Sequence, residues 1–428
     1  MEKQLSADYD FSTPQALARR RQLEQNPASR TNHMAYLPGM EQLNSNICAQ
    51  VIGQMQSYDY NAYTADDVQA ALAHEVCAPD DFKALLSPAA EPFLEAMAQR
   101  AQRETSRHFG NTVYLFTPLY LANYCENYCV YCGFNCYNQI KRMRLDRRQM
   151  EQEMQVIAAS GMEEILLLTG ESRRHSSLEY IGEACRLARR YFRLVGVEIY
   201  PVNTDEYRFL HECGVDYVTV FQETYDSNRY EQLHLLGPKR VWPYRFAAQE
   251  RALRAGMRGV ACSALLGLAD FRRDALAGAL HVYYLQRQYP QAEFSLSCPR
   301  LRPILHNAAI SPQNFGQNVG ERQLCQILCA YRIFLPYVGI TVSSRESAAF
   351  RDGIVKIAAT KVSAGVSTGI GDHAQKYNRQ DSHKTPDLNR ENAGDEQFAI
   401  ADGRSLPQIA AAVAAEGLQP VLNDYLYV

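Results

Sequence analysis

From about residue 111 onward, short apolar runs alternate with segments whose apolar residues recur at helical spacing. Short apolar runs bounded by turn residues predict strands, and a repeat near 3.6 residues predicts amphipathic helices. Eight runs fit the strand pattern: Val113–Leu121, Ile165–Leu168, Val195–Tyr200, Tyr217–Phe221, Val260–Leu265, Phe294–Ser297, Ile340–Ser343 and Ile357–Val362. Strands that alternate with helices form right-handed βαβ units around a parallel sheet. Eight such units predict an α/β fold, a (β/α)8 barrel of the TIM type.

Segments with helical spacing lie between most of the predicted strands and also before and after the barrel. Helices are predicted over Ala65–Glu75, Arg147–Ala159, Leu178–Phe192, Asp205–Cys213, Pro243–Ala255, Asp270–Tyr289, Glu321–Leu335 and Leu406–Glu416. Residues 373–397 are almost wholly polar and predict a long loop. The sequence therefore predicts an N-terminal helical extension (1–110) that packs on one end of the barrel, the barrel itself (111–370), and a C-terminal polar segment followed by a helix (371–428).

Polar side chains follow most of the predicted strands. Catalytic groups of such barrels lie at the carboxyl ends of the strands, so these positions are the candidate site. In chain order they are the cysteine-rich stretch 124–134, Glu171, Glu198, Glu223, Arg300 with Arg302, Arg345, and Ser363.

Composition narrows the class of protein. Apolar residues make up 46% of the chain, charged residues 21%, and the net charge is −3, so neither a nucleic-acid partner nor a membrane partner is expected. The N-terminal stretch has no apolar segment typical of an export signal. Twelve cysteines in a chain without such a signal favour a reducing compartment over a disulfide framework. We therefore expect a cytoplasmic protein.

The cysteine-rich stretch carries the most specific chemistry. Cys125, Cys129 and Cys132 follow a C-x3-C-x2-C spacing, which lets three thiolates of one loop wrap around one small cluster. Three ligands leave one iron of a [4Fe–4S] cluster open. With Tyr131 directly before the last cysteine, this motif resembles the radical S-adenosylmethionine (SAM) superfamily signature. The alternatives are three buried thiols or a zinc site, for which Cys136 is close enough to be a fourth ligand.

The resemblance implies that the open iron binds the amino and carboxylate groups of SAM. Glu171, in Thr-Gly-Glu, resembles the contact to the SAM amino group, since a carboxylate suits an ammonium. Its alternative role is an acid at a helix N-terminus. Glu223 and Arg245 are candidates for the SAM ribose and carboxylate, although Arg245 is equally consistent with a solvated helix residue. Tyr131, directly before the last cysteine of the motif, is also a candidate for contact with the cofactor.

Three arginines are candidates for a substrate clamp. Arg300 and Arg302, in Cys-Pro-Arg-Leu-Arg-Pro, and Arg345, in Ser-Ser-Arg-Glu, follow predicted strands. A guanidinium clamps a carboxylate at two points, as an amino-acid substrate requires, and Ser363 would add a hydroxyl contact. The alternative is that these arginines pair with structural acids such as Glu171, Glu198 or Glu346. Arg345 is the favoured ligand of the substrate carboxylate.

A closer resemblance covers nearly the whole chain. The runs NYCENYCVYCGF, LLLTGE, FQETY, PRLRP, SSRES, FRD and AAEGLQPV are similar to the 2-iminoacetate synthase family, the tyrosine lyases of thiamine thiazole biosynthesis. The resemblance implies that an adenosyl radical takes a hydrogen from the amino group of L-tyrosine and that the Cα–Cβ bond breaks. The products are 2-iminoacetate and p-cresol. It also implies a thiazole synthase partner and an external reductant such as flavodoxin or ferredoxin.

Three alternatives to this interpretation are open. The tyrosine lyase of [FeFe]-hydrogenase maturation carries further cluster cysteines in a C-terminal extension, whereas no cysteine follows Cys329 here. The tryptophan lyase of peptide-antibiotic biosynthesis differs mainly in its aromatic pocket, which the sequence does not define. A non-catalytic metal-binding scaffold is the third.

Overall fold

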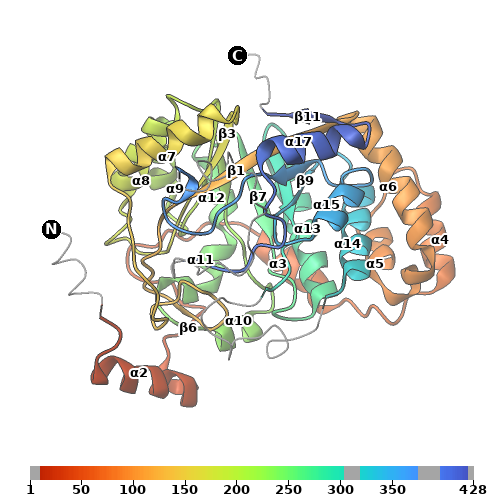
Figure 1. Cartoon of the computed structure of the whole chain (residues 1–428). Coiled ribbons are helices and arrows are strands. Elements are labelled where there is room, and N and C mark those ends of the chain that lie inside the picture. The colour runs from red at the N-terminus through yellow and green to blue at the C-terminus, as the bar shows by residue number, and fades with distance from the viewer. Residues whose placement is uncertain (1–9, 303–318, 375–395, 423–428) are drawn as a thin grey trace.

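Eight parallel strands close into a barrel in which the first strand pairs with the last (Figure 1). The structure, a computed structural model, describes residues 10–302, 319–374 and 396–422. Around the ring the strands are β1 (Thr112–Ala122), β3 (Glu164–Thr169), β4 (Leu194–Glu198), β5 (Tyr217–Thr219), β7 (Gly259–Ser263), β8 (Glu293–Ser297), β9 (Gly339–Val342) and β10 (Lys361–Ser363). This arrangement confirms the predicted (β/α)8 fold.

Two shorter pairings complete the strands. The N-terminal end of β1, from Thr112 to Tyr114, also pairs in parallel with β11 (Gln419–Val421). The end of the described chain therefore returns to the barrel wall. A separate antiparallel ribbon joins β2 (Tyr128–Cys129) to β6 (His234–Leu236). Because β2 lies in the cysteine-rich stretch, the ribbon ties that stretch to the loop that follows β5.

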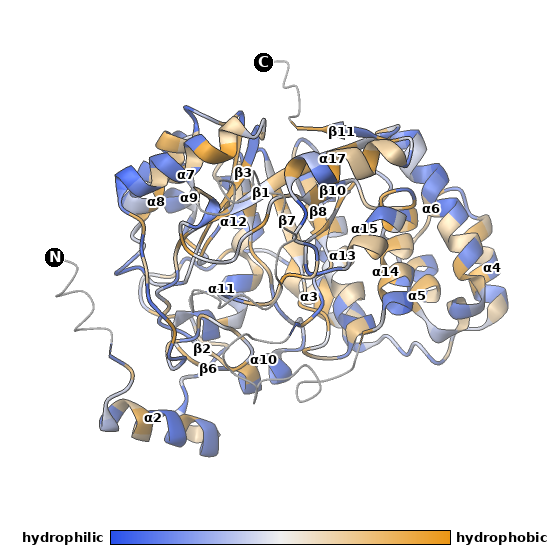
Figure 2. Ribbon diagram, in the orientation of Figure 1, coloured by the Kyte–Doolittle hydropathy of each residue, from blue (hydrophilic) through white to orange (hydrophobic). Residues whose placement is uncertain are grey.

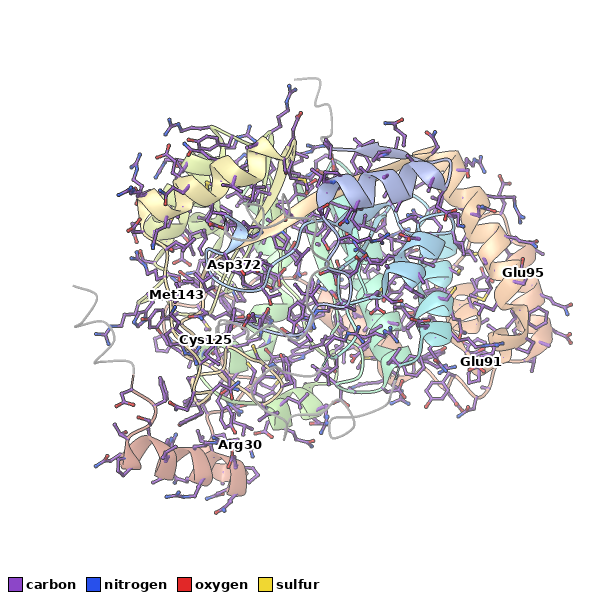
Figure 3. The ribbon with its side chains drawn as sticks, in the orientation of Figure 1. Arg30, Glu91, Glu95, Cys125, Met143 and Asp372 are labelled. Carbon is purple, nitrogen blue, oxygen red and sulfur yellow. The ribbon has the colours of Figure 1, made fainter. Side chains whose placement is uncertain are left out.

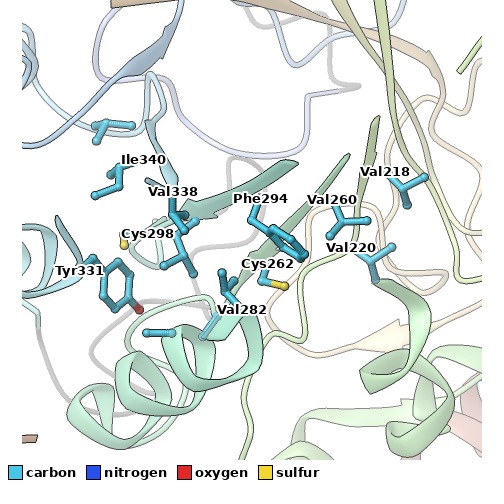
Figure 4. Close-up of a cluster of buried hydrophobic side chains, with 14 of the residues drawn as sticks. Val218, Val220, Val260, Cys262, Val282, Phe294, Cys298, Tyr331, Val338 and Ile340 are labelled. Atoms are coloured by element: carbon cyan, nitrogen blue, oxygen red, sulfur yellow. The ribbon is translucent and has the colours of Figure 1, made fainter. Parts of the chain in front are cut away.

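The two faces of the strands differ in side-chain size. Outward-facing Val218, Val260, Phe294 and Ile340 are buried against the surrounding helices, and Figure 4 shows them in one apolar layer with Val282 of the helix behind. Several of the alternate, inward-facing positions carry small groups, namely Gly196, Thr219, Ala261, Ser295 and Thr341, although Leu166 and Leu168 of β3 also line the cavity. Barrel interiors are usually filled by bulky branched side chains. The small inward residues leave this barrel hollow.

Amphipathic helices cover the outside of the barrel, with apolar faces turned inward (Figure 2). They are α7 (Arg147–Ala159), α8 (Leu178–Ala188), α9 (Thr204–Glu212), α10 (Ser227–Leu233), α11 (Trp242–Phe246), α12 (Ala248–Arg254), α13 (Phe271–Gln288), α14 (Glu321–Phe334), α15 (Ala348–Ile354) and α17 (Leu406–Ala415), with the 3-10 turn η3 (Pro238–Arg240). Side-chain caps define several starts; Asp146, for example, accepts from the backbone N–H of Gln149 at the start of α7.

The N-terminal helices pack on the outer helices of the barrel. They are α2 (Pro14–Gln25), α3 (Ile47–Gln56), α4 (Ala65–Ala73), α5 (Pro79–Leu86) and α6 (Leu94–Phe109), with the 3-10 turns η1 (Pro27–Ser29) and η2 (Pro88–Phe93). The α3 helix packs on α13, and α5 and α6 pack on α14, whereas α2 lies beside β6 (Figure 1). The three-part domain division itself stays a prediction.

Several predicted boundaries differ from the observed ones. The last barrel strand begins at Lys361, because a turn (355–358) and two further residues follow α15 before the strand starts. The helix predicted over Pro243–Ala255 is interrupted at Ala247. Most of the polar stretch 373–397 lies outside the described residues. None of the helices within the described ranges combines the length and the apolarity needed to cross a bilayer.

The buried side chain of Arg332 links α14 to the loop before β9 and to the turn after α15. Its guanidinium donates to the carbonyls of Pro336 at 2.8 Å, Val338 at 2.9 Å and Ala358 at 3.0 Å, and it lies 4.5 Å from the centroid of the Phe109 ring. A buried carbonyl that loses its donor costs about 1–3 kcal/mol.

Replacing Arg332 with alanine should therefore destabilise the protein by about 3 kcal/mol or more, because two buried carbonyls and one half-buried carbonyl lose their donor together. The measurement is the apparent midpoint of thermal unfolding by scanning fluorimetry. The exposed Arg103 of α6, changed to alanine, is the matched control and should leave the midpoint unchanged. An equal midpoint in the two variants would contradict the assigned role of Arg332.

Candidate active site

A cavity of about 820 Å³ runs inside the barrel and reaches the end where the strands terminate. We call this end the mouth. The cavity is lined there by Tyr131 and Cys132 of the cysteine loop, Glu198 at the end of β4, Glu223 after β5 and Arg345 after β9. Enclosed cavities of this size are typical of small-molecule sites. Most sequence-predicted residues therefore face one volume.

The cysteine loop follows β1 directly and folds back toward it. Cys125 and Cys129 are buried, and the half-buried Cys132 lines the cavity. Cys125 lies on the same side of the molecule as Met143 (Figure 3), where the chain returns to β1 and the amide of Asn123 donates to the Met143 carbonyl at 3.1 Å. Burial raises the pKa of the Cys125 thiol to about 11. Burial also raises the pKa of Cys129, although the positive charge of Lys239 opposes the rise.

Arg142 holds the second half of the loop. Its two terminal nitrogens donate to the carbonyls of Asn123 at 2.7 Å, Phe134 at 2.9 Å, Asn135 at 2.6 Å and Asn138 at 3.1 Å. A planar guanidinium suits such a set of acceptors because its donors point outward in a fixed fork. The loop is therefore shaped by a side chain outside the cysteine motif.

Glycine is required where the loop meets β3. A Cβ on Gly170 would overlap the backbone carbonyl of Tyr124. The close approach lets the amide of Glu126 donate to the Glu171 carbonyl at 3.0 Å. The glycine in Thr-Gly-Glu thus places the Glu171 carboxylate directly beside the cysteine loop.

Glu171 sits in a buried group of charges. Its Oε1 accepts from Arg245 Nη1 at 3.0 Å and lies 3.3 Å from Lys239 Nζ, while its Oε2 accepts from Asn127 Nδ2 at 3.3 Å. Burial acts to raise the pKa of Glu171, but Lys239 and Arg245 outweigh it and the pKa is lowered. Glu171 is thus a carboxylate with one oxygen heavily paired and the other facing the cysteine loop.

Glu223 completes this charge group from the end of β5. Its carboxylate accepts from Lys239 Nζ at 2.8 Å and lies 3.6 Å from Arg245 Nη2. Its backbone φ is +70°, a left-handed conformation that is uncommon outside glycine. The amide of Leu265 holds it there by donating to its carbonyl at 2.8 Å. Such held strain is often found at functional sites, and here it turns the carboxylate toward Lys239.

The Tyr131 hydroxyl faces a buried histidine, His234. The Tyr131 hydroxyl lies 2.8 Å from Nε2 of His234, whose Nδ1 lies 2.8 Å from the Tyr230 carbonyl. Burial, followed by the charge of Lys239, lowers the pKa of His234 well below its usual range. Its Nδ1 therefore carries the proton and donates to the carbonyl, and Nε2 accepts from Tyr131.

The three candidate arginines have different environments. Arg300 Nε donates to Glu346 at 3.0 Å and Nη1 donates to the Val319 carbonyl at 2.8 Å, so its charge is already paired. Arg302 lines the cavity. Arg345 also lines the cavity, and its guanidinium stacks 3.5 Å from the centroid of the Phe398 ring. In the described part of the chain, no carboxylate forms an ion pair with Arg345.

Ser363 lies in the wall beside Arg345. It is buried, its hydroxyl accepts from the Ser344 amide at 3.1 Å, and it lines the cavity. Arg351 donates to its carbonyl. The hydroxyl is thus oriented by the segment that carries Arg345.

Glu198, at the end of β4, is another acidic group that lines the cavity. Burial, reinforced by the charge of Glu223 and opposed by that of Arg345, raises the pKa of Glu198 to about 7. The carboxyl is therefore close to half-ionised at neutral pH. A group with a pKa near the working pH is suited to exchanging a proton with a ligand.

Comparison with known proteins agrees with this geometry. Residues 119–277 match the Radical SAM superfamily, and residues 297–419 match the Biotin and Thiamin Synthesis associated domain. The 2-iminoacetate synthase of Escherichia coli (strain K12) is 40% identical over 366 residues, which cover 85% of this chain and 92% of that protein. That of Salmonella typhimurium is 39% identical over the same coverage. The chain belongs to the 2-iminoacetate synthase family.

Solved structures place the family among related barrels. The [FeFe]-hydrogenase maturase HydG from Carboxydothermus hydrogenoformans superposes with a TM-score of 0.77 at 26% identity, covering 90% of this chain and 86% of that one. Methylornithine synthase shares the fold, with a TM-score of 0.63 at 19% identity over 83% of this chain and 97% of that one. Members of the superfamily are radical SAM enzymes, and this family member is a lyase.

Membership of the superfamily implies a [4Fe–4S] cluster and SAM, and the donor set fits both. In residues 10–302, 319–374 and 396–422, no three His, Cys, Asp or Glu side chains converge tightly enough to ligate one ion. A four-iron cluster instead takes each thiolate on a different iron. Two amide groups donate to the thiols, Asn127 to Cys125 Sγ at 3.6 Å and Gln397 to Cys132 Sγ at 3.8 Å. Such donors suit charged, metal-bound sulfur better than a neutral thiol.

Several residues of the site escaped the sequence interpretation. Lys239, Asn127, Gln397 and Phe398 all contact predicted site residues. Lys239 follows a Gly-Pro turn, and nothing in that pattern marks it as part of a site. Asn127 lies inside the cysteine motif, where its position between two ligands is the only available signal.

Cys136 packs away from the cavity, in an apolar cluster with Leu23, Tyr128, Tyr137 and Leu235. We therefore expect Cys136→Ala to retain about four irons and four sulfides per chain after anaerobic reconstitution. Cys129→Ala, the same substitution in the same loop, should lose most of both. Iron and sulfide analysis provides the measurement, and loss of iron in Cys136→Ala would make Cys136 a ligand.

Glu198 makes the stability of the ligand-free protein depend on pH. Its pKa rises from 4.5 unfolded to about 7 folded, so the folded state binds the proton more tightly. Stability is greatest below the unfolded pKa and falls as pH increases toward 7, by about 3 kcal/mol at most. Glu198→Gln cannot ionise, so its thermal midpoint should exceed the wild-type midpoint increasingly between pH 5 and pH 8. A constant difference across this range would refute the assignment.

Proposed function

We propose that the protein cleaves the Cα–Cβ bond of L-tyrosine to give 2-iminoacetate and p-cresol, for the thiazole branch of thiamine biosynthesis. The proposal rests on one observation above the others, which is the arginine at position 345 inside the cavity. Its charge faces the same volume as Cys132, and the described carboxylates leave it without an ion-pair partner. A buried cation of this kind needs an anion, and an amino-acid carboxylate supplies one.

We further propose how the chain holds its cofactors. Cys125, Cys129 and Cys132 would bind the [4Fe–4S] cluster, and Glu171 would accept the SAM ammonium through the oxygen that faces the cysteine loop. Glu223 and Arg245 would bind the ribose and the carboxylate of SAM. When bound, the cluster and SAM supply the 5′-deoxyadenosyl radical that takes a hydrogen atom from the substrate.

The protein residues then act by orientation and exclusion of water. Arg345, with Ser363 in the adjoining wall, would fix the carboxylate end of the substrate. Glu198, with its pKa close to neutrality, is the group in the cavity suited to accept a proton from the substrate ammonium. Because the cavity is enclosed by the barrel, the imine product is shielded from hydrolysis while it forms.

Tyrosine is favoured as the substrate by relatedness. The curated relatives at 40% and 39% identity are 2-iminoacetate synthases, the family that the sequence resemblance links to tyrosine cleavage. We also propose that a thiazole synthase receives the imine and that an external reductant, such as flavodoxin or ferredoxin, supplies the electron.

An anaerobic product assay tests this function. Reconstituted protein with SAM, dithionite and L-tyrosine should release p-cresol and 5′-deoxyadenosine in parallel, and L-tryptophan should release no methylindole product. SAM cleavage without p-cresol would exclude the tyrosine assignment. One zinc per chain in place of about four irons would favour the non-catalytic scaffold.

Arg345→Ala should lower kcat/KM for p-cresol formation by roughly 10- to 150-fold or more, because a charged hydrogen-bonded contact is worth about 1.5–3 kcal/mol. Slow cleavage of SAM uncoupled from tyrosine should persist. Arg302→Ala, which removes the other candidate lining the cavity, is the comparison. If Arg302→Ala shows the larger loss and Arg345→Ala keeps wild-type turnover, Arg302 is the carboxylate ligand.

A further inference from the structure

Residues 396–405 form a strap that crosses the mouth of the barrel. The strap is anchored on the segment that follows β9. The amides of Ala401 and Asp402 donate to the Ser344 carbonyl at 2.9 and 3.1 Å. Asp402 pairs with Arg351 at 2.5 Å in the protein interior, and Arg404 pairs with Asp352 at 2.8 Å. The position of the strap is therefore set by two ion pairs on α15.

These anchors bring Gln397 onto the cysteine loop. A Cβ on Gly133 would overlap the backbone carbonyl of Gln397, so the strap and the loop touch where Gly133 follows Cys132. The Gln397 side chain bridges two residues of the cavity wall. Its Oε1 accepts from the Tyr120 hydroxyl at 3.0 Å, and its Nε2 donates to Cys132 Sγ at 3.8 Å.

The two bonds of Gln397 depend on each other. A phenol donor at the amide oxygen leaves only the amide nitrogen to face the sulfur, so Tyr120 fixes which end of the amide points at Cys132. The next residue along the strap, Phe398, lies under the Arg345 guanidinium, and Thr368 donates to its carbonyl at 3.2 Å. Consecutive strap residues thus contact Cys132 and Arg345.

We propose that the strap is a working part of the active site, in which Gln397 tunes the cluster through Cys132 and Phe398 positions Arg345 for the substrate. Both are positioning residues. The inference rests on the proposed function for the identity of the cluster and the substrate. It adds a link between the C-terminal segment and the reduction step.

The tuning has a definite sign. Hydrogen bonds to ligating sulfurs are among the factors that set the potential of iron–sulfur clusters. An N–H donor stabilises the reduced cluster more than the oxidised one, because the reduced cluster carries one more negative charge. Removing the Gln397 donor should shift the reduction midpoint to more negative potential.

The test uses the reconstituted full-length protein without SAM or tyrosine. EPR-monitored redox titration should give a more negative midpoint for Gln397→Leu than for wild type. Tyr120→Phe should shift the midpoint in the same direction, because the amide is then free to turn. Gln419→Leu, the same change at an exposed position of the C-terminal segment, is the control and should keep the wild-type midpoint. If Gln397→Leu binds no cluster, Gln397→Asn, one methylene shorter, provides the measurement.

Phe398 should give the opposite pattern. Phe398→Leu should keep the wild-type midpoint but raise KM for tyrosine roughly two- to thirtyfold, since a cation–π contact is worth about 0.5–2 kcal/mol. A wild-type midpoint in Gln397→Leu or Gln397→Asn with iron content intact would overturn the role of Gln397. An unchanged KM in Phe398→Leu would overturn that of Phe398. Failure of the proposed function would appear separately, as absence of p-cresol with wild-type protein.

Discussion

Burial of two carboxylates together with two cations is the constraint on which the mouth of this barrel depends. Glu171, Glu223, Lys239 and Arg245 come from the ends of β3 and β5, from η3 and from α11. Each buried charge alone would cost several kcal/mol, so the four are stable there only as a group. Lys239 and Arg245 each approach both carboxylates. The charge balance therefore fixes four chain segments relative to one another.

The same balance reaches the cysteine loop through Asn127. Its amide nitrogen contacts both Glu171 and Cys125, and its oxygen accepts from the Lys239 amide at 2.9 Å. The loop is thus held from the inside by the charge group and from the outside by Arg142. Support from side chains outside the motif therefore adds to the loop's own apolar packing in keeping its ligands in place.

The sequence predicted what depends on local patterns and missed what depends on tertiary closure. Strand and helix periodicity placed the barrel, and the spacing of Cys125, Cys129 and Cys132 marked the loop. Local patterns did not predict which of the candidate arginines pairs with an acid and which faces the cavity. Glu346 is adjacent to Arg345 in the chain, yet it pairs with Arg300 on another strand end. That distant pairing leaves Arg345 facing the cavity, and no local pattern distinguishes the two arginines. Gln397 was hidden for the same reason, because it meets Cys132 only after the chain has closed over the barrel.

The hollow lumen has an energetic consequence. Small inward residues such as Gly196, Ala261 and Ser295 forgo the dispersion contacts that bulky layers supply in a filled barrel. The ligand-free barrel therefore relies more on its outer layers, where α13 and α14 are packed between the strands and the N-terminal helices. Molecules that bind only the folded barrel also stabilise it, in proportion to the logarithm of their concentration over the dissociation constant. Binding of cofactor and substrate in the cavity thus adds stability that the wall residues do not provide. The open lumen therefore lowers the free energy of unfolding least when the site is occupied.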